Sequence, residues 1–138
     1  MVIPDVQAKE GQDFTFLRNV GQYMVDKKPD IVVCTGDFAD MPSLSSYDVG
    51  KKSFEGKRYV KDIQAATEAM NALLGPLKEY NVRAKKNKEK QYKPRLVLTL
   101  GNHEQRIIKA VENDPKLEGL IQISDLPYKD WEVLPLLS

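Results

Sequence analysis

The chain has 138 residues, of which 41% are hydrophobic and 30% charged, and its 21 basic and 20 acidic side chains leave a net charge of +1. This length fits one domain, and the near balance of charge argues against a protein built for wholesale binding of nucleic acid or anionic membrane. A single cysteine and a single histidine exclude an intramolecular disulfide, a cysteine-based zinc site and any site that needs two imidazoles from this chain. The lone cysteine and the lack of a membrane-length apolar run favour a cytoplasmic protein without a membrane partner.

The beginning of the chain predicts a strand, a helix and a second strand. Residues 1–4 are apolar and run into Asp5, as in a short strand that ends at a carboxylate. Apolar residues then recur at helical spacing from Asp13, the expected N-cap, to Pro29, which cannot continue a helix. Residues 30–35 form a continuous β-branched and apolar run, as expected of a strand that is buried on both faces. Together these segments predict one βαβ unit.

The middle of the chain predicts a long loop, the longest helix and a basic segment. Residues 42–58 follow neither the helical nor the strand period and indicate a loop. Apolar residues keep helical spacing over residues 60–80, with a kink or an early end expected at the pair Gly75-Pro76. Residues 81–93 contain six basic side chains and one acidic side chain, which is typical of a solvated helix end and loop.

The last part of the chain predicts a third buried strand over residues 95–100 and helices over about 104–112 and 116–123. Residues 132–134 indicate the start of a fourth strand. The alternation of strands and helices is typical of an α/β protein with a mostly parallel sheet. Because the first strand is short and no partner follows the fourth, we expect residues 1–138 to form a single domain that is truncated, with an intact small domain as the alternative.

Each of the first three predicted strands has polar residues at its carboxyl end. The three clusters are Asp5 with Gln7, Gly36-Asp37 with Asp40, and Gly101-Asn102-His103-Glu104. Parallel strands with right-handed crossovers bring such ends to one edge of the sheet, where ligands bind. Carboxylates, amide oxygens and one imidazole suit Mn²⁺, Mg²⁺, Fe or Zn²⁺, and a carboxylate that bridges two such ions creates a site that clamps a phosphate and activates a water. Asp37 is the natural bridge, and Gly36 and Gly101 permit tight turns.

Each cluster taken alone also has an ordinary structural explanation. An Asp after a buried strand is often a helix cap or a turn residue, and a His at the start of a helix is often a cap or a surface residue. Three strand ends that carry Asp, Gly-Asp and Gly-Asn-His-Glu in this order are much harder to explain as turns. We therefore favour one shared functional site.

The three clusters resemble the N-terminal motifs of the calcineurin-like metallophosphoesterases, which are Asp-x-His, Gly-Asp-x-x-Asp and Gly-Asn-His-Glu or Asp. The resemblance covers about residues 2–106, and the opening residues 3–7 are similar to those of phage-encoded members. It implies the N-terminal half of a metallophosphoesterase α/β sandwich, built from βαβ layers. It also implies hydrolysis of phosphomonoesters or phosphodiesters with two divalent ions, foremost Mn²⁺, with Mg²⁺, Fe or Zn²⁺ as alternatives.

The resemblance also implies roles for single residues. The metal ligands would be Asp5, Gln7, Asp37 and Asn102, with Asp37 shared by both ions. His103 would protonate the leaving oxygen or stabilise the phosphoryl transition state, and Asp40 would support it as the second catalytic residue. Gln7 stands where the family has a His ligand, which shifts the first metal site towards Mg²⁺ or Mn²⁺. The later His ligands of the family have no counterpart in this chain, so its activity alone is expected to be low.

Two other functions stay open. The chain could be a catalytically inactive remnant of the fold, or a module that binds single-stranded nucleic acid through the basic segments 51–58 and 83–93, in which aromatic residues alternate with the charges. The expected partner is a phosphate ester, with nucleic acids and nucleotides among the candidates, and the location would be the host cytoplasm for a phage-encoded protein. The substrate, its binding residues and the oligomeric state are not predicted.

Overall fold

The computed structural model describes residues 1–4, 6–42, 56–113, 116 and 119–135. The strands are β1 (Val2–Ile3), β2 (Ile31–Cys34), β3 (Arg95–Thr99) and β4 (Glu132–Leu134), and the helices are α1 (Thr15–Lys27), α3 (Gly56–Lys86), α4 (Asn102–Asn113) and the 3₁₀ helix η2 (Ile123–Asp125). The strands form one sheet in the order β1-β2-β3-β4, and every neighbouring pair is parallel. The predicted α/β class and parallel sheet are therefore confirmed.

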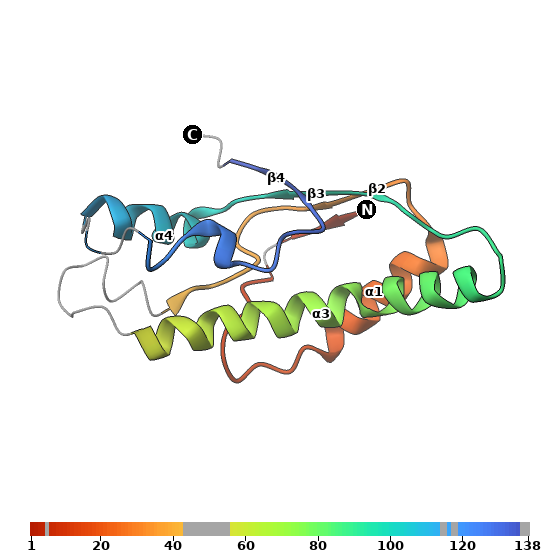
Figure 1. Cartoon of the computed structure of the whole chain (residues 1–138), viewed down its shortest axis with the longest axis horizontal. Helices are drawn as coiled ribbons and strands as arrows, with labels where there is room; N and C mark the ends of the chain where they lie inside the picture. The colour runs from red at the N-terminus through yellow and green to blue at the C-terminus, as the bar shows by residue number, and fades with distance from the viewer. Residues whose placement is uncertain (5, 43–55, 114–115, 117–118, 136–138) are drawn as a thin grey trace.

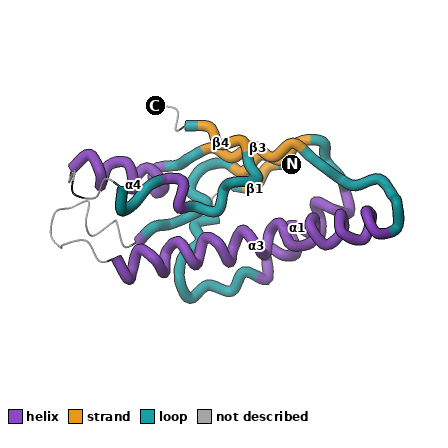
Figure 2. The backbone as a smooth tube through the Cα atoms, viewed as in Figure 1, coloured by secondary structure: helices purple, strands orange, loops and turns teal. Residues whose placement is uncertain are grey.

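The sheet is covered by α1 and α3 on one face (Figures 1 and 2). On that face Val32 pairs with Leu96 and Cys34 with Leu98, and all four side chains are buried. Side chains that alternate with them are half-buried or exposed, and Ile31 is 45% exposed. The prediction that the strands are buried on both faces is thus wrong for the residues that the structure describes. A β-branched run also suits a half-exposed sheet face, so composition alone did not distinguish the two cases.

The longest helix, α3, continues through Pro76 over 31 residues, so the predicted early end there is wrong. The reason lies in its packing against α1. Gly21 of α1 is buried, and a Cβ at this position would lie only 2.1 Å from the backbone oxygen of Leu73. This close contact, with Leu73 and Leu74 buried beside it, offsets the roughly 3 kcal/mol that a proline costs inside a helix. Although α3 is long, no described helix has both the length and the apolar character needed to cross a membrane.

Several predicted boundaries shift by a few residues. The N-cap of α1 is Phe14 instead of Asp13, although the Asp13 carboxylate accepts hydrogen bonds from the backbone N–H and the hydroxyl of Thr15, at 2.9 and 2.6 Å. The predicted loop 42–58 lies mostly outside the described residues, and its last three positions belong to α3.

The third strand is confirmed as β3 and the fourth as β4, whereas the helices around them differ from the prediction. α4 begins at Asn102, two residues before the predicted start. Residues 119–122 are not helical, and a 3₁₀ turn follows at Ile123–Asp125. Gly119 adopts a φ of +83°, which breaks a right-handed helix, and this explains why the predicted helix 116–123 is wrong there.

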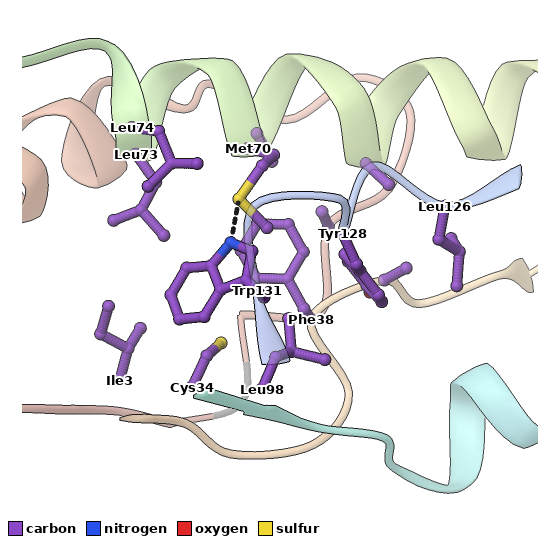
Figure 3. Packing of buried hydrophobic residues seen from close by; sticks show 14 of the residues in the cluster. Ile3, Cys34, Phe38, Met70, Leu73, Leu74, Leu98, Leu126, Tyr128 and Trp131 are labelled. Atoms are coloured by element: carbon purple, nitrogen blue, oxygen red, sulfur yellow. Dashed lines mark hydrogen bonds between the residues drawn. The ribbon is translucent and has the colours of Figure 1, made fainter. Parts of the chain in front are cut away.

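The core lies between the sheet and α3, and Figure 3 shows part of it. Trp131, which precedes β4, is only 6% exposed, and its indole N–H donates to the sulfur of Met70 at 3.2 Å. Phe38 and Tyr128 pack nearby with their rings edge to face, at 6.0 Å and 84°. The segment before β4 is therefore attached both to α3 and to the loop that follows β2.

Candidate active site

The loops that follow β1 and β2 lie side by side, as the parallel topology predicts. The N–H of Gln7 donates to the carbonyl of Asp37 at 2.8 Å, and Ala8 forms a parallel bridge with Ala39. The N–H of Asp40 returns to the carbonyl of Ala8 at 3.0 Å. Backbone hydrogen bonds thus join the first two predicted clusters.

The loops that follow β2 and β3 are in even closer contact, at Gly36 and Gly101. A Cβ on Gly36 would lie 2.7 Å from the Cα of Gly101, and a Cβ on Gly101 would lie 2.2 Å from Oδ1 of Asp37. No side chain fits at these distances, so both positions require glycine for close approach of the backbone. The Gly36 N–H also donates to the Thr99 hydroxyl at 2.9 Å, which joins the two strand ends.

Asp37 lies at the centre of this edge in an uncommon backbone conformation. Its φ is +63°, a left-handed value that costs a non-glycine residue energy and often marks functional sites. Its side chain is half-buried, and Oδ1 accepts the backbone N–H of His103 at 2.8 Å. Within the part of the chain that the structure describes, Oδ2 receives no hydrogen bond. Among the described residues, the backbone of His103 therefore holds one of the two oxygens of the Asp37 carboxylate.

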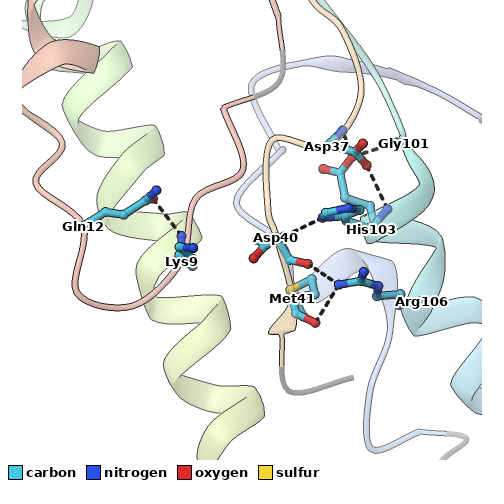
Figure 4. Close-up of polar contacts among 9 residues, drawn as sticks. Lys9, Gln12, Asp37, Asp40, Met41, Gly101, His103 and Arg106 are labelled. Atoms are coloured by element: carbon cyan, nitrogen blue, oxygen red, sulfur yellow. Dashed lines mark hydrogen bonds and ion pairs between the residues drawn. The ribbon is translucent and has the colours of Figure 1, made fainter. Parts of the chain in front are cut away.

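His103 points toward Asp40 (Figure 4). Its Nδ1 lies 2.5 Å from Oδ1 of Asp40, with the two side chains 24% and 18% exposed. Nδ1 is buried and has no regular hydrogen-bond partner among the described residues, so this contact is a close approach of the ring nitrogen to the carboxylate. Arg106 holds the same loop by donating to the carbonyls of Asp40 and Met41, at 2.8 and 3.4 Å. This contact engages Nδ1, and Nε2 is the other nitrogen of the ring.

Glu104 is fully buried beneath these loops. Its Oε1 accepts the backbone N–H groups of Asp37 and Gly101, at 3.0 and 2.9 Å, and its Oε2 accepts the hydroxyl of Tyr128. Burial raises the pKa of Glu104, and these hydrogen bonds act in the opposite direction. Burial and the neighbouring Glu104 raise the pKa of Tyr128 well above its ordinary value. Sequence reasoning included Glu104 in the third cluster without giving it a role of its own, and it missed Tyr128, which belongs to no sequence motif.

The predicted metal ligands are only partly within the described residues. Asp5 lies outside them, whereas Gln7 and Asn102 are exposed. The backbone of Gln7 is hydrogen-bonded to Asp37, and Asn102 follows Gly101, which is in close contact with Asp37. No group of three His, Cys, Asp or Glu side chains suited to a metal forms in the described part of the chain. The donors present are a half-buried carboxylate oxygen and neutral amide oxygens. Hard divalent cations such as Mg²⁺ and Mn²⁺ prefer such oxygens, so the donor chemistry fits them.

The two basic segments lie far apart. Of the segment 51–58 the structure describes residues 56–58, which begin α3, whereas Arg83, Lys85 and Lys86 are in its last turn. A 31-residue helix is about 45 Å long, so the described parts of the two segments do not share one surface. The exposed residues 85–90 lie at the end of the molecule opposite α4 (Figure 1).

These features define a parallel α/β protein with a polar candidate site at the carboxyl edge of its sheet, where the Asp37 and Asp40 carboxylates meet His103. The family model for calcineurin-like phosphoesterases matches residues 1–138. The chain therefore belongs to the calcineurin-like phosphoesterase family, whose members generally bind divalent metals. Comparison with curated proteins and comparison with solved structures returned no match.

Proposed function

We propose that the chain is a dinuclear-metal phosphoesterase that hydrolyses phosphomonoesters or phosphodiesters at the edge formed by the loops after β1, β2 and β3. The observation that supports this most is the arrangement around His103. Its backbone N–H binds the Asp37 carboxylate at 2.8 Å, and its ring lies 2.5 Å from the Asp40 carboxylate. Asp37, the candidate metal ligand, and His103, the candidate general acid, are thereby held next to each other.

Two divalent ions, foremost Mn²⁺, would be held by Asp37 together with Asp5, Gln7 and Asn102. When bound, such ions polarise phosphate oxygens and activate a water. The half-buried Asp37 is the shared ligand in this proposal, because it is the carboxylate at the centre of the edge. These side chains are few for two ions that each take about six donors, so we expect weak binding of the second ion and slow turnover.

His103 delivers a proton to the leaving oxygen from Nε2. The contact of Nδ1 with Asp40 orients the ring and compensates its positive charge while the proton is held. Arg106 contributes indirectly, because its hydrogen bonds to the carbonyls of Asp40 and Met41 fix the loop that carries the supporting carboxylate.

The test is release of p-nitrophenol from mono- and bis-p-nitrophenyl phosphate with Mn²⁺, Mg²⁺ or Zn²⁺ and with chelator. We expect metal-dependent release that is slower than the ordinary enzyme range of about 1 s⁻¹ or more. The variant His103→Ala should keep Mn²⁺ affinity while turnover falls by about 10²–10⁴-fold, the usual contribution of a general acid. Loss of metal binding and of turnover together would instead make His103 a ligand.

Other results would support the other functions. No release with any of the three metals would favour an inactive remnant. Tight, salt-sensitive binding of single-stranded DNA without metal would favour the nucleic-acid module.

A further inference from the structure

Tyr128 and Glu104 form a buried link beneath the candidate active site. Tyr128 is 5% exposed and Glu104 is 0% exposed, and the tyrosine hydroxyl donates to Oε2 of the carboxylate. The other oxygen, Oε1, accepts the N–H groups of Asp37 and Gly101. One side chain from the segment before β4 is thus connected, through a single carboxylate, to the ends of both β2 and β3.

The ring of Tyr128 makes a second contact with the same loop. It packs edge-on against Phe38, the residue after Asp37, with ring centres 6.0 Å apart. The tyrosine is itself held in place, because the N–H of Trp131 donates to its carbonyl at 3.1 Å and the Trp131 indole binds Met70 of α3. Tyr128 therefore connects the candidate site to the hydrophobic core.

From this geometry we propose that Tyr128 is a positioning residue, which acts through Glu104 to fix the backbone of Asp37 and Gly101 and thereby the direction of the Asp37 carboxylate. For its effect on metal binding, this inference rests on the proposed function. The left-handed conformation of Asp37 costs energy and persists only where its surroundings hold it. Glu104 supplies such support, because its Oε1 accepts the N–H of Asp37. Without the hydroxyl, Oε2 would lose the hydrogen bond from Tyr128 in a buried place, and the carboxylate would rotate or shift away from the N–H groups of Asp37 and Gly101.

The test compares Tyr128→Phe with Tyr59→Phe. Tyr128→Phe removes the hydroxyl and keeps the ring against Phe38. Tyr59 is an equally buried tyrosine, 5% exposed, whose hydroxyl donates to the Asp125 carboxylate at 2.7 Å. Its hydroxyl binds Asp125 of η2 instead of Glu104, so Tyr59→Phe controls for the general effect of losing a buried tyrosine hydroxyl bound to a carboxylate.

Two properties are measured at a temperature where thermal melting shows each variant to be folded. In metal-free protein, amide hydrogen exchange of Asp37 and Gly101 should be about tenfold faster in Tyr128→Phe, while exchange in the middle of β2 and β3 stays unchanged. The affinity for Mn²⁺, titrated by calorimetry, should fall by about tenfold. Tyr59→Phe should change neither property.

Unchanged exchange of the two amides in folded Tyr128→Phe, or an equal change in Tyr59→Phe, would overturn the inference. If the amides respond but the unaltered chain binds no Mn²⁺, the positioning role stands and the proposed metal site is wrong. If Mn²⁺ binds and its affinity is the same in Tyr128→Phe, the metal site stands and Tyr128 does not position it.

A second pair of variants applies if Tyr128→Phe does not fold. Glu104→Gln can keep both N–H bonds through its amide oxygen and donate to the Tyr128 hydroxyl oxygen, whereas Glu104→Met has a similar length and lacks these acceptors. We expect slow exchange of the Asp37 and Gly101 amides in the first variant and exchange about tenfold faster in the second. Equal exchange in the two variants would overturn the inference.

Discussion

Replacement of Gly101 by alanine tests the closest contact in the site. A Cβ at this position would lie 2.2 Å from Oδ1 and 2.4 Å from the backbone nitrogen of Asp37. Ordinary contact distances start at 3.4 Å, so the loops after β2 and β3 would have to separate by about 1 Å. Glu104 could then no longer accept both N–H groups at 3.0 and 2.9 Å.

The expected loss in the free energy of unfolding is about 3 kcal/mol, of which overpacking contributes about 2 and a weakened buried hydrogen bond about 1. With a urea dependence of about 2 kcal/mol per molar, Gly101→Ala should unfold at a urea concentration about 1.5 M lower. The fluorescence of Trp131, the single tryptophan and a buried one, reports the transition. The affinity of the folded variant for Mn²⁺ should also fall, because Asp37 is displaced.

Gly75→Ala is the matched control, because the same substitution meets only the flexible end of Arg18, at 3.1 Å, inside α3. Alanine is favoured over glycine in a helix, so this variant should be about 0.5–1 kcal/mol more stable than the unaltered chain. If Gly101→Ala stays within about 1 kcal/mol of the unaltered chain, below the usual overpacking range, the close approach of the two strand ends is refuted.

Three further predictions concern the donors and the buried acid. Asp37→Asn should keep the bond to the His103 N–H and lower Mn²⁺ affinity by about 100-fold or more, equivalent to about 2.7 kcal/mol, and calorimetry showing equal affinity would exclude Asp37 as the bridge. Gln7→His should raise the affinity for Zn²⁺ or Mn²⁺, because imidazole is the better donor, and no change would mean that this side chain does not bind metal. Glu104 has a raised pKa in the folded state, so the native protein holds more protons and its stability falls as pH rises from about 4.5 through the raised value. Relative to Glu104→Gln, the unaltered chain should therefore lose stability over this range in urea titrations, and parallel pH curves would contradict the shift.

The sequence by itself determined the class of the fold and the edge of the sheet at which the candidate site lies. Strand and helix periods depend on neighbouring residues, so β2, β3 and the course of α3 up to Pro76 were predictable from local patterns. The direction of the strands followed from the alternation of strands and helices, and this direction placed Asp37 and His103 at one edge. The family resemblance rested on the same residues and is confirmed by the match over residues 1–138. The roles of the single site residues stay predictions.

Only the tertiary structure decided the features that depend on contacts between distant segments. α3 passes through Pro76 because Gly21, far away in the sequence, lets α1 approach its backbone. The one-sided burial of β2 and β3 depends on which helices cover the sheet, and the continuous apolar runs of these two strands did not reveal it. Tyr128 and Glu104 are 24 residues apart and belong to no common pattern, yet their buried bond connects the core to the site. The oxygens of a buried carboxylate need hydrogen-bond donors, and only the folded chain brings those donors together.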